Sequence, residues 1–263
     1  LTGGEPLLRP GIAELVGRIS DETLAEDVAI TTNGLLLARK ARLLRDKGLD
    51  RVNLSLDGLD PGVFQAMSGG YGRVEQVLAA IDACLDCGLR LKLNCVVRRG
   101  VNDAEIPAMI RFGRERGIEV RFIEYMDVGC SNGWTRGDVF TAKEMLESIS
   151  RDVGEARPID MPESAVARQY ELVGAGYRFG IIASVTEPFC RGCVRARISA
   201  EGKLFTCLFS NSGHDLRPML QRGDEALRDG LAMIWGLRSD RYSEIRGAES
   251  ATRERIEMSY IGG

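Results

Sequence analysis

A unit of helix followed by strand recurs along the first half of the chain, and it limits the possible folds more than any other feature. Three helical runs each end in a glycine that can cap them, at Gly48, Gly88 and Gly117. A strand-like run follows each glycine directly, reading RVNLSLDG, LRLKLNCVV and IEVRFIEYM. Residues 24–32 supply a further strand, and residues 1–2 the end of another. This alternation predicts a parallel sheet with right-handed crossovers.

One face of the predicted sheet is polar, whereas parallel strands are usually apolar on both faces. Strand alternation collects the polar side chains on this face. The residues on this face are Asp27, Ala29, Thr31, Asn53, Ser55, Asp57, Arg90, Lys92, Asn94, Glu119 and Arg121, all polar except Ala29. A closed eight-stranded barrel fills its interior with branched apolar side chains. A cationic interior instead predicts an incomplete, open barrel whose lumen holds a charged ligand. The alternative, an open sheet with one partly solvated face, fits Lys92 and Arg121 poorly.

Three cysteines with the spacing C-x2-C-x13-C predict a metal centre. Cys190 and Cys193 can grip one centre from a tight turn, and Cys207 can return on the far strand of a hairpin that turns at 199–203. A structural zinc site takes four protein ligands, so three thiolates favour an iron–sulfur cluster with one open iron. A zinc knuckle with a fourth ligand from elsewhere is the alternative. Arg195 and Arg197 form a cradle for a polyanion, because guanidinium groups match phosphate oxygens.

The other cysteines and the overall charge narrow the class of protein. Seven cysteines, an odd count, in a chain without a secretory signal favour a reducing, cytoplasmic compartment. Cys84 and Cys87 form a second C-x2-C, but Cys84 falls on the apolar face of a helix and Cys95 on the apolar face of a strand, so we expect them in the core. The net charge of −3 gives no global attraction to nucleic acid, and no apolar run is long enough for a membrane span.

The pattern changes after Gly129, which divides the chain into a partial (β/α) barrel at 1–129 and a C-terminal region at 130–263. The second region holds a predicted helix at 141–150, a strand-rich stretch at 168–210 that contains the cysteines, and a helical stretch at about 215–236. The chain begins at Leu1 with no initiator methionine, from which we expect a fragment whose N-terminal part is missing.

In order along the chain, the motifs TGGEPLLR, TTNG, VNLSLDG, LKLNCVV, RFIEYMDVG, FCRGCVRARISAEGKLFTCLF and MSYIGG resemble one family. This family is the GTP 3′,8-cyclases, which are radical S-adenosylmethionine (SAM) enzymes of molybdenum cofactor biosynthesis. The resemblance covers essentially the whole chain. GGEP alone points only to the radical SAM superfamily, whereas the cysteine spacing with its R-A-R and the terminal double glycine are specific to the cyclases.

The resemblance implies an α/β fold, an incomplete (β/α)6 radical SAM barrel that lacks its first strand or strands and carries a C-terminal cluster-binding extension. It implies two [4Fe–4S] clusters, one held by Cys190, Cys193 and Cys207. The first cluster of the family sits on a C-x3-C-x2-C loop that this sequence lacks, so the chain by itself is expected to be inactive. Val194 stands where relatives often carry a polar residue.

The resemblance also implies binding residues. Gly3 and Gly4 resemble the strand end that approaches the ammonium of SAM, since glycine allows close backbone contact. Ser55 and Met126 match other SAM-contacting positions. The positions that match GTP contacts in the family are Thr31, Lys92, Arg195, Ala196 and Arg197. We expect Arg121 to join them in binding GTP. Strand alternation alone also places Thr31, Ser55, Lys92 and Arg121 in the lumen.

The implied reaction is the conversion of GTP to (8S)-3′,8-cyclo-7,8-dihydroguanosine 5′-triphosphate. A radical derived from SAM removes the 3′ hydrogen of GTP, and the ribosyl radical attacks C8 of guanine. The open iron of the C-terminal cluster would hold the guanine. The implied partners are GTP, SAM, an electron donor and a downstream pterin synthase, and a homodimer is left open. Gly262 and Gly263 are expected to reach the active site and to position GTP.

Two other readings of the sequence remain open. One is a different radical SAM enzyme with an auxiliary cluster, such as a peptide-maturation enzyme, although those usually carry more C-terminal cysteines. The other is a non-catalytic, metal-stabilised binding module that has lost its SAM cluster. A C-x3-C-x2-C motif upstream of Leu1 would favour an enzyme, and a start codon at this point would favour the module.

Overall fold

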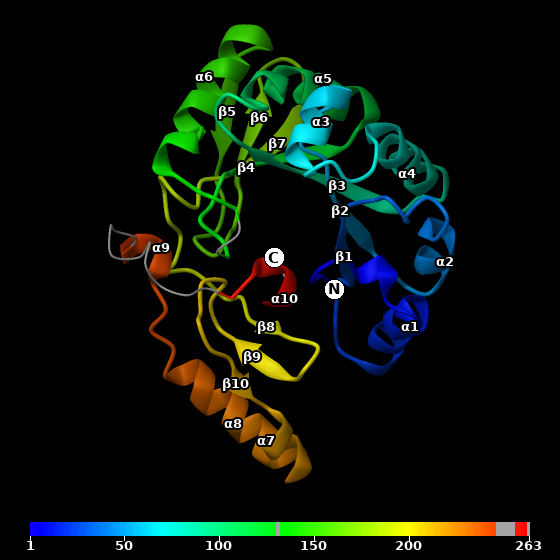
Figure 1. The fold of residues 1–263 in the computed structure, drawn as a ribbon, viewed down its shortest axis with the longest axis vertical. Helices are drawn as coiled ribbons and strands as arrows, with labels where there is room; N and C mark the ends of the chain where they lie inside the picture. The colour runs from blue at the N-terminus through cyan, green and yellow to red at the C-terminus, as the bar shows by residue number, and fades with distance from the viewer. Residues whose placement is uncertain (130–131, 246–255, 262–263) are drawn as a thin grey trace.

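The computed structural model describes residues 1–129, 132–245 and 256–261, and it contains a seven-stranded sheet and a three-stranded sheet (Figure 1). The large sheet has the order β1-β2-β3-β4-β7-β6-β5, and its first five strands run parallel. The strands are β1 (Ala29–Thr32), β2 (Arg51–Ser55), β3 (Arg90–Val97), β4 (Glu119–Glu124), β5 (Ala156–Ile159), β6 (Arg168–Leu172), β7 (Tyr177–Ile182), β8 (Arg197–Ile198), β9 (Lys203–Phe205) and β10 (His214–Asp215).

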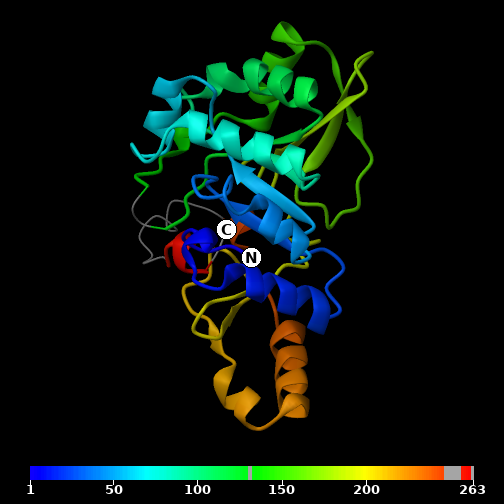
Figure 2. The same cartoon turned by 90° about the vertical axis from the view of Figure 1, so that its right-hand side faces the viewer.

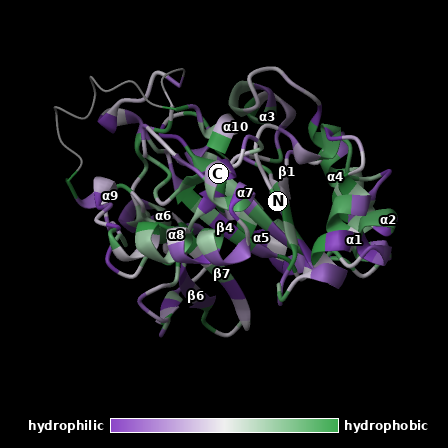
Figure 3. Ribbon diagram, turned by 90° about the horizontal axis from the view of Figure 1, so that it is seen from below, coloured by the Kyte–Doolittle hydropathy of each residue, from purple (hydrophilic) through white to green (hydrophobic). Residues whose placement is uncertain are grey.

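The helices that precede β5 in the chain cover the convex side of the arc that the large sheet forms (Figure 1). The α-helices are α1 (Ile12–Glu22), α2 (Ala41–Asp46), α3 (Pro61–Met67), α4 (Val74–Asp86), α5 (Ile106–Arg116), α6 (Ala142–Asp152), α7 (Arg217–Gln221), α8 (Asp224–Gly236), α9 (Tyr242–Ile245) and α10 (Met258–Ile261). The short 3-10 helices are η1 (Pro6–Leu8), η2 (Asp103–Glu105) and η3 (Arg136–Asp138). Helices α1 and α4 carry both hydrophobic and hydrophilic residues (Figure 3), as amphipathic helices on a sheet do.

The predicted helix ends are confirmed by the backbone. Gly48, Gly88 and Gly117 all have positive φ, at 91°, 73° and 66°. A residue with a Cβ is strained in this left-handed conformation, so glycine is the residue that can end each helix and turn the chain into the next strand. At the end of α5, the N–H of Ile118 donates to the carbonyl of Gly113 at 2.8 Å and so closes the turn. Local sequence therefore determines where each strand of the sheet begins.

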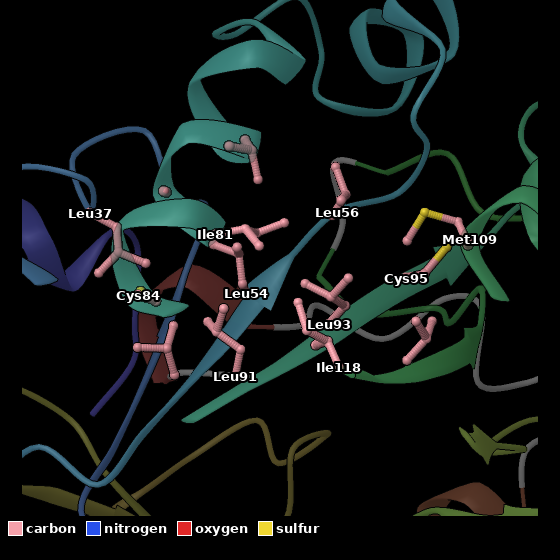
Figure 4. Packing of buried hydrophobic residues seen from close by; sticks show 14 of the residues in the cluster. Leu37, Leu54, Leu56, Ile81, Cys84, Leu91, Leu93, Cys95, Met109 and Ile118 are labelled. Atoms are coloured by element: carbon pink, nitrogen blue, oxygen red, sulfur yellow. The ribbon is translucent and has the colours of Figure 1, made fainter. Parts of the chain in front are cut away.

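The main core lies between the sheet and these helices, and Figure 4 shows its packing around β2, β3 and α4. Leu54 and Leu93 from the strands and Ile81 from α4 are fully buried. Cys84 and Cys95 lie in the same cluster, which confirms the prediction that they are core residues. The apolar face of the sheet is thus buried against the helices, and the opposite face carries the polar side chains.

The first residue of the chain lies along the outer edge of β1. The amino group of Leu1 donates to the carbonyl of Ala29 at 2.6 Å, and the N–H of Thr31 donates to the carbonyl of Leu1 at 2.9 Å. This is the bonding pattern of a neighbouring parallel strand, as the sequence predicted for residues 1–2. The fold is therefore a mixed α/β structure with a mainly parallel sheet, consistent with a partial barrel.

The large sheet continues beyond Gly129. Strand β7 pairs in parallel with β4, and β6 and β5 extend the sheet as antiparallel neighbours. Helix α6 lies in the crossover from β4, where the sequence predicts a helix at 141–150. The division of the chain at 129 and 130 is an interpretation of the sequence pattern, and the sheet itself runs across it.

A smaller layer of strands β8–β10 with α7 and α8 projects from one end of the molecule (Figure 2). The predicted hairpin turn at 199–203 is present, because β8 and β9 pair as antiparallel strands and the N–H of Gly202 donates to the carbonyl of Ser199 at 2.9 Å. In the view of Figure 1 helix α10 (red) lies in the opening between the two sheets, and Figure 2 shows it toward one side of the molecule. In the part of the chain that the structure describes, no helix has the length and apolarity needed to cross a bilayer.

We expect Leu93→Ala to destabilise the protein by about 2–5 kcal/mol, because Leu93 is fully buried between the sheet and the helices and its truncation leaves a cavity. Urea unfolding at equilibrium measures this difference. Leu24→Ala is the matched control, since Leu24 is fully exposed, and it should change the free energy of unfolding by less than about 0.5 kcal/mol. Equal losses in the two variants would contradict the placement of the core.

Candidate functional site

Polar side chains form rows across the concave face of β1–β4. The strand register places Thr31 opposite Asn53, Asn53 opposite Lys92, and Lys92 opposite Glu119. Each of these residues is partly exposed, while the residues between them on the strands are buried. The amide of Asn53 donates to the hydroxyl of Thr31 at 3.3 Å. The polar face predicted from strand alternation is therefore present, and Thr31 and Lys92 lie on it.

Glu119 holds both predicted lumen cations. The ammonium of Lys92 lies 2.9 Å from Oε2 of Glu119, and Nε of Arg121 donates to Oε1 at 2.8 Å. Gln169 on β6 donates to the same Oε1 at 3.1 Å. Burial alone would raise the pKa of Glu119, but hydrogen bonds from Arg121 and Lys92 outweigh it and lower the pKa. The carboxylate therefore stays ionised and keeps two cations side by side on the concave face.

A pocket of about 260 Å³ lies beyond the carboxyl ends of β1 and β2. Its lining residues are Asn33, Leu35, Ser55, Asp57, Phe64, Ser68 and Tyr71. Ser55, predicted to contact SAM, forms part of the wall, and Ser68 Oγ is buried without a hydrogen-bond partner among the described residues. The carboxyl edge is where open α/β sheets bind their ligands. The pocket therefore offers a half-apolar, half-polar site next to the cationic row.

Asp57 in this pocket is a buried carboxyl group. Burial raises its pKa to about 6, and a hydrogen bond from the N–H of Val96 at 2.8 Å opposes the rise only in part. The side chain of Asn102 donates to the carbonyl of Asp57 at 2.7 Å and to that of Val96 at 2.7 Å. These bonds fix the end of β2 against β3 and so fix the wall that contains Ser55.

The segment with the two N-terminal glycines is anchored beside β1. Gly3 and Gly4 have positive φ, at 94° and 32°. Glu5 accepts hydrogen bonds from the hydroxyl of Thr32 at 2.7 Å and from the N–H of Asn33 at 2.9 Å. A Cβ built on Gly4 would meet no atom within 4 Å, so open space lies next to its backbone. The geometry leaves room at Gly4 for a ligand such as the predicted SAM.

Met126 lies just after β4. In the sheet, β2 and β3 lie between β4 and β1, and the glycine segment lies beside β1. It is half-buried, and its carbonyl accepts a hydrogen bond from the side chain of Asn132 at 2.9 Å. One residue further on, Asp127 is 3% exposed. Met126 and Gly4 thus lie near the carboxyl edge at different strands, so one ligand contacting both would extend along this edge of the sheet.

The three cysteines of the C-terminal motif are free, half-buried thiols. The N–H of Cys193 donates to the carbonyl of Cys190 at 3.2 Å, which gives the predicted tight turn. Cys207 follows β9, and its Sγ accepts from the N–H of Phe209 at 3.4 Å. The charge of Cys190 contributes to raising the pKa of Cys207, after the larger effect of burial, so the two thiols lie within electrostatic reach of each other.

Cys193 differs from Cys207 in its surroundings. Arg195 donates to the Cys193 sulfur from Nε at 3.3 Å and from its terminal nitrogen at 3.1 Å. Burial raises the pKa of Cys193, but hydrogen bonds from Arg238 and Arg195 outweigh it and bring the pKa to about 7. A thiolate, the form that ligates metals, is therefore accessible at neutral pH.

The arginines between the cysteines lie against the thiols. Arg195 also stacks over Phe189, with 4.9 Å from guanidinium carbon to ring centre. Burial and the charge of Arg195 lower the pKa of Arg197, and the sulfurs of Cys207 and Cys193 oppose this. Ala196 between them is exposed. The R-A-R run is thus part of the cysteine site, with two cations near the sulfurs of Cys193 and Cys207.

The donor set fits an iron–sulfur cluster better than a single ion. Within residues 1–129, 132–245 and 256–261, no three His, Cys, Asp or Glu side chains are close enough together to hold one metal ion. A cluster is wider than one ion and takes one thiolate for each iron that it ligates. The three thiols of the motif are therefore candidate ligands for three irons of such a cluster.

Glu124 binds the segment that leads from β7 to Cys190 (here called the cysteine arm) to the end of β4. No sequence pattern indicated this role. Its buried carboxylate accepts the N–H groups of Ala142 at 2.9 Å, Val185 at 2.8 Å and Thr186 at 2.9 Å, as well as the Thr186 hydroxyl. The segment from β7 to Cys190 is therefore fixed to the end of β4.

Glu119 is the other functional residue that sequence reasoning described incompletely. Strand alternation places it on the polar face, but its role as a shared counter-charge appears only in the structure. The contact from Gln169, fifty residues away in the sequence, helps to hold the carboxylate. A pairing across that distance leaves no local signal, so only the sheet order could have revealed it.

Gly262 and Gly263, the predicted end of the tail, lie outside the described residues. Helix α10, just before them, packs on the hairpin of β8 and β9. Ile261 is buried, and the Tyr260 hydroxyl donates to Glu201 at 2.5 Å. The segment directly before the double glycine is thus anchored to the rest of the protein through Tyr260 and Ile261.

Comparisons with known proteins agree with this geometry. The Radical SAM superfamily model matches residues 1–113, and the Molybdenum Cofactor Synthesis C model matches residues 118–244. A GTP 3′,8-cyclase of Xanthomonas campestris pv. campestris is 44% identical over 265 residues, covering 100% of this chain and 78% of the relative. A GTP 3′,8-cyclase of Acidothermus cellulolyticus is 44% identical over 295 residues, covering 100% and 80%.

Among solved structures, Streptococcus suis SuiB bound to S-adenosylmethionine is similar with a TM-score of 0.60 and 16% identity. The similarity covers 93% of this chain and 55% of SuiB. At this level of identity the likeness concerns the fold alone, and the radical SAM assignment comes from the family model that matches residues 1–113.

We expect Asp57→Asn to stabilise the protein at pH 7 relative to the wild type, and to lose this advantage at pH 4. The pKa of Asp57 in the folded protein is raised to about 6. Between the pKa of the unfolded chain and this value, the folded protein binds more protons than the unfolded chain does. The free energy of unfolding of the wild type therefore falls as the pH rises through this range. Each pH unit between the two pKa values is worth about 1.4 kcal/mol, so the gain at pH 7 is up to about 3 kcal/mol.

The measurement is urea unfolding of the wild-type protein and the variant at both pH values. The amide oxygen of the variant would keep the acceptor for the N–H of Val96, while the substitution removes the charge. Asp60→Asn is the control, because Asp60 is exposed. A difference between variant and wild type that does not change with pH would contradict the buried carboxyl with its raised pKa.

Proposed function

The chain belongs to the GTP 3′,8-cyclase family, and from this premise we propose which of its residues convert GTP to 3′,8-cyclo-7,8-dihydroguanosine 5′-triphosphate in molybdenum cofactor biosynthesis. The observation that carries the proposal is the cationic row on the concave face of a parallel sheet, with a three-thiol, two-arginine site in the same chain. The triphosphate of GTP needs several cations, which the row and the two arginines offer. The guanine base needs a separate contact, which the cysteine site would offer.

The triphosphate would bind Lys92 and Arg121 from the sheet and Arg195 and Arg197 from the cysteine turn, with Thr31 at the edge of the row. Guanidinium groups make paired, charge-assisted hydrogen bonds to phosphate oxygens. Lys92 and Arg121 are already side by side through Glu119, so little side-chain freedom is lost on binding. Ala196, without a long side chain, leaves space between the two arginines of the turn.

The SAM site would lie along the carboxyl edge, with Gly4, Ser55 and Met126 as contacts. When bound, SAM and its iron–sulfur cluster supply the hydrogen-abstracting radical, and the second cluster, on Cys190, Cys193 and Cys207, supplies an open iron for the base. The protein's own residues hold the two nucleosides, orient the ribose of GTP and limit the access of water. The double glycine at 262 and 263 would act in the same step, by positioning GTP.

The proposal extends to the surroundings of the enzyme. An electron donor would supply the reducing equivalent for SAM cleavage, and a pterin synthase would take up the cyclic nucleotide. The cytoplasm is the proposed location, because the thiols that would hold the cluster must stay reduced. Anaerobic assay of the full-length gene product with GTP, SAM and a reductant tests the activity; protein loaded with both clusters that forms no cyclic nucleotide would overturn it.

We expect Cys207→Ala to lose the C-terminal cluster, because two thiolates then remain where three are needed. Iron and sulfide analysis after anaerobic reconstitution should show a fall of one cluster per chain. Cys87→Ala is the matched control, since Cys87 is a buried thiol outside the motif, and its iron content should equal that of the wild type. Tightly bound zinc in the wild type, or an unchanged iron content in Cys207→Ala, would disprove the ligand assignment.

We expect Glu119→Gln to bind inorganic triphosphate more tightly, because a negative charge beside two cations is removed while an acceptor for Arg121 remains. The side chains at this site are partly exposed, so the gain should be about fivefold at low salt and smaller at high salt. Calorimetric titration measures both. Glu115→Gln, at an exposed position, should bind as the wild type does. Weaker binding by Glu119→Gln would contradict a phosphate site at Lys92 and Arg121.

A further inference from the structure

Residues 238–242 (here called the connector) follow α8 and end at the first residue of α9, and they contact both cysteine-bearing segments and the barrel. Every second residue makes these contacts: Arg238, Asp240 and Tyr242. None of these three residues is among the proposed SAM or GTP contacts.

Arg238 fixes the first cysteine segment. Its terminal nitrogen donates to the carbonyl of Cys193. The guanidinium carbon lies 4.8 Å from the ring centre of Trp235, at the end of α8, and only 12% of the side chain is exposed. A cation stacked on an indole and largely shielded from water has little freedom to move. The C-x2-C turn is therefore bonded to a side chain that α8 itself holds in place.

Asp240 fixes the second cysteine segment. The hydroxyl of Thr206, the residue before Cys207, donates to Oδ2 of Asp240 at 2.6 Å. The same oxygen lies 3.4 Å from Nε of Arg238. Asp240 thus joins the segment of Cys207 to the residue that binds the segment of Cys193. The two parts of the C-x2-C-x13-C motif are linked through the connector as well as through their own hairpin.

Tyr242 joins this assembly to the barrel. Its ring stacks on Phe209, with centroids 4.4 Å apart and planes at 22°, and the N–H of Phe209 donates to the Cys207 sulfur. The Tyr242 hydroxyl donates to Oδ2 of Asp127 at 2.6 Å. Asp127 is buried and directly follows Met126, the proposed SAM contact. One side chain therefore links the cysteine site on one side to the end of β4 on the other.

We propose that the connector is a positioning element, which sets the three-cysteine site at a fixed distance and angle from the carboxyl end of β4. This rests on the proposed function in one respect: if GTP is bound at the cysteine site and SAM at the edge of the sheet, then the connector sets how the two nucleosides face each other. Hydrogen abstraction depends steeply on such placement. Arg238, Asp240 and Tyr242 act through the cysteine segments and Asp127, so they are positioning residues.

The connector contains its own controls. Ser239 and Arg241 lie between the three contacting residues and are exposed, and Arg241 pairs with Glu244 in the next helix. Ser239→Ala and Arg241→Ala alter the same stretch of chain without removing a contact to the cysteine segments. Tyr242→Phe removes the hydroxyl that binds Asp127 and keeps the ring that stacks on Phe209.

The first experiment needs no cluster. In the cluster-free full-length protein, alkylation of Cys207 followed by mass spectrometry should be about tenfold faster in Thr206→Val than in the wild type. The variant loses the hydrogen bond to the Asp240 carboxylate, which eases local opening, and it keeps the carboxylate charge that also raises the pKa of Cys207. Buried Cys84 serves as an internal reference for global unfolding, and its rate should stay unchanged. Ser239→Ala and Arg241→Ala should match the wild type. An unchanged Cys207 rate in Thr206→Val would overturn the proposal.

The second experiment uses the fully loaded enzyme. Tyr242→Phe should keep the wild-type iron and sulfide content and a KM for GTP within about twofold, while kcat falls about tenfold, because placement and not binding is lost. Unchanged kcat, or a loss confined to KM, would overturn the role of Tyr242. If the wild-type protein holds no cluster on Cys190, Cys193 and Cys207, the proposed function fails, and the alkylation experiment still decides whether the connector holds the cysteine segments.

Discussion

Side chains along β1–β4 point alternately to the two faces of the sheet, and the apolar ones pack against the helices. The other face cannot be packed in the same way, because it carries Lys92, Arg121 and Glu119 on neighbouring strands. Two cations there would repel each other without the shared carboxylate. Glu119 therefore makes the charged face compatible with folding, and it leaves the two cations partly exposed toward the space that the sheet encloses.

The second half of the molecule is organised around connections back to this sheet. Glu124, at the last position of β4, accepts hydrogen bonds from the start of α6 and from the segment that leads to Cys190. Asp127, three residues later, accepts one from Tyr242. One strand thus fixes the crossover helix, the cysteine arm and the connector. The cysteine site has little apolar core of its own, since its small cluster centres on Leu204, Leu216 and Ile234, so these polar contacts matter for its placement.

Much of the fold and part of the site could be predicted from the sequence, because the relevant signals are local. Glycines at the helix ends, such as Gly117, and the alternation in β3 indicate elements and faces without knowledge of distant contacts, and the structure has Lys92 on the polar face as expected. The pairing of β7 with β4 was not predicted, since no local pattern says which strands become neighbours. The bond from Tyr242 to Asp127 spans 115 residues and involves an irregular segment, so periodicity carries no information about it. The roles in binding SAM and GTP come from the family to which the chain belongs.

The central claim is that the cationic row binds the triphosphate of GTP. The most direct measurement is equilibrium binding of GTP and of guanosine to Lys92→Ala, Arg121→Ala and Arg42→Ala, at low and high salt. Arg42 is the control because it is an exposed arginine on α2, away from the polar face of the sheet. Our account predicts that Lys92→Ala and Arg121→Ala each weaken GTP binding about tenfold or more at low salt, as expected for loss of a charged hydrogen bond, with guanosine binding and the Arg42 variant unaffected. Equal affinity for GTP in all three variants and the wild type would contradict it.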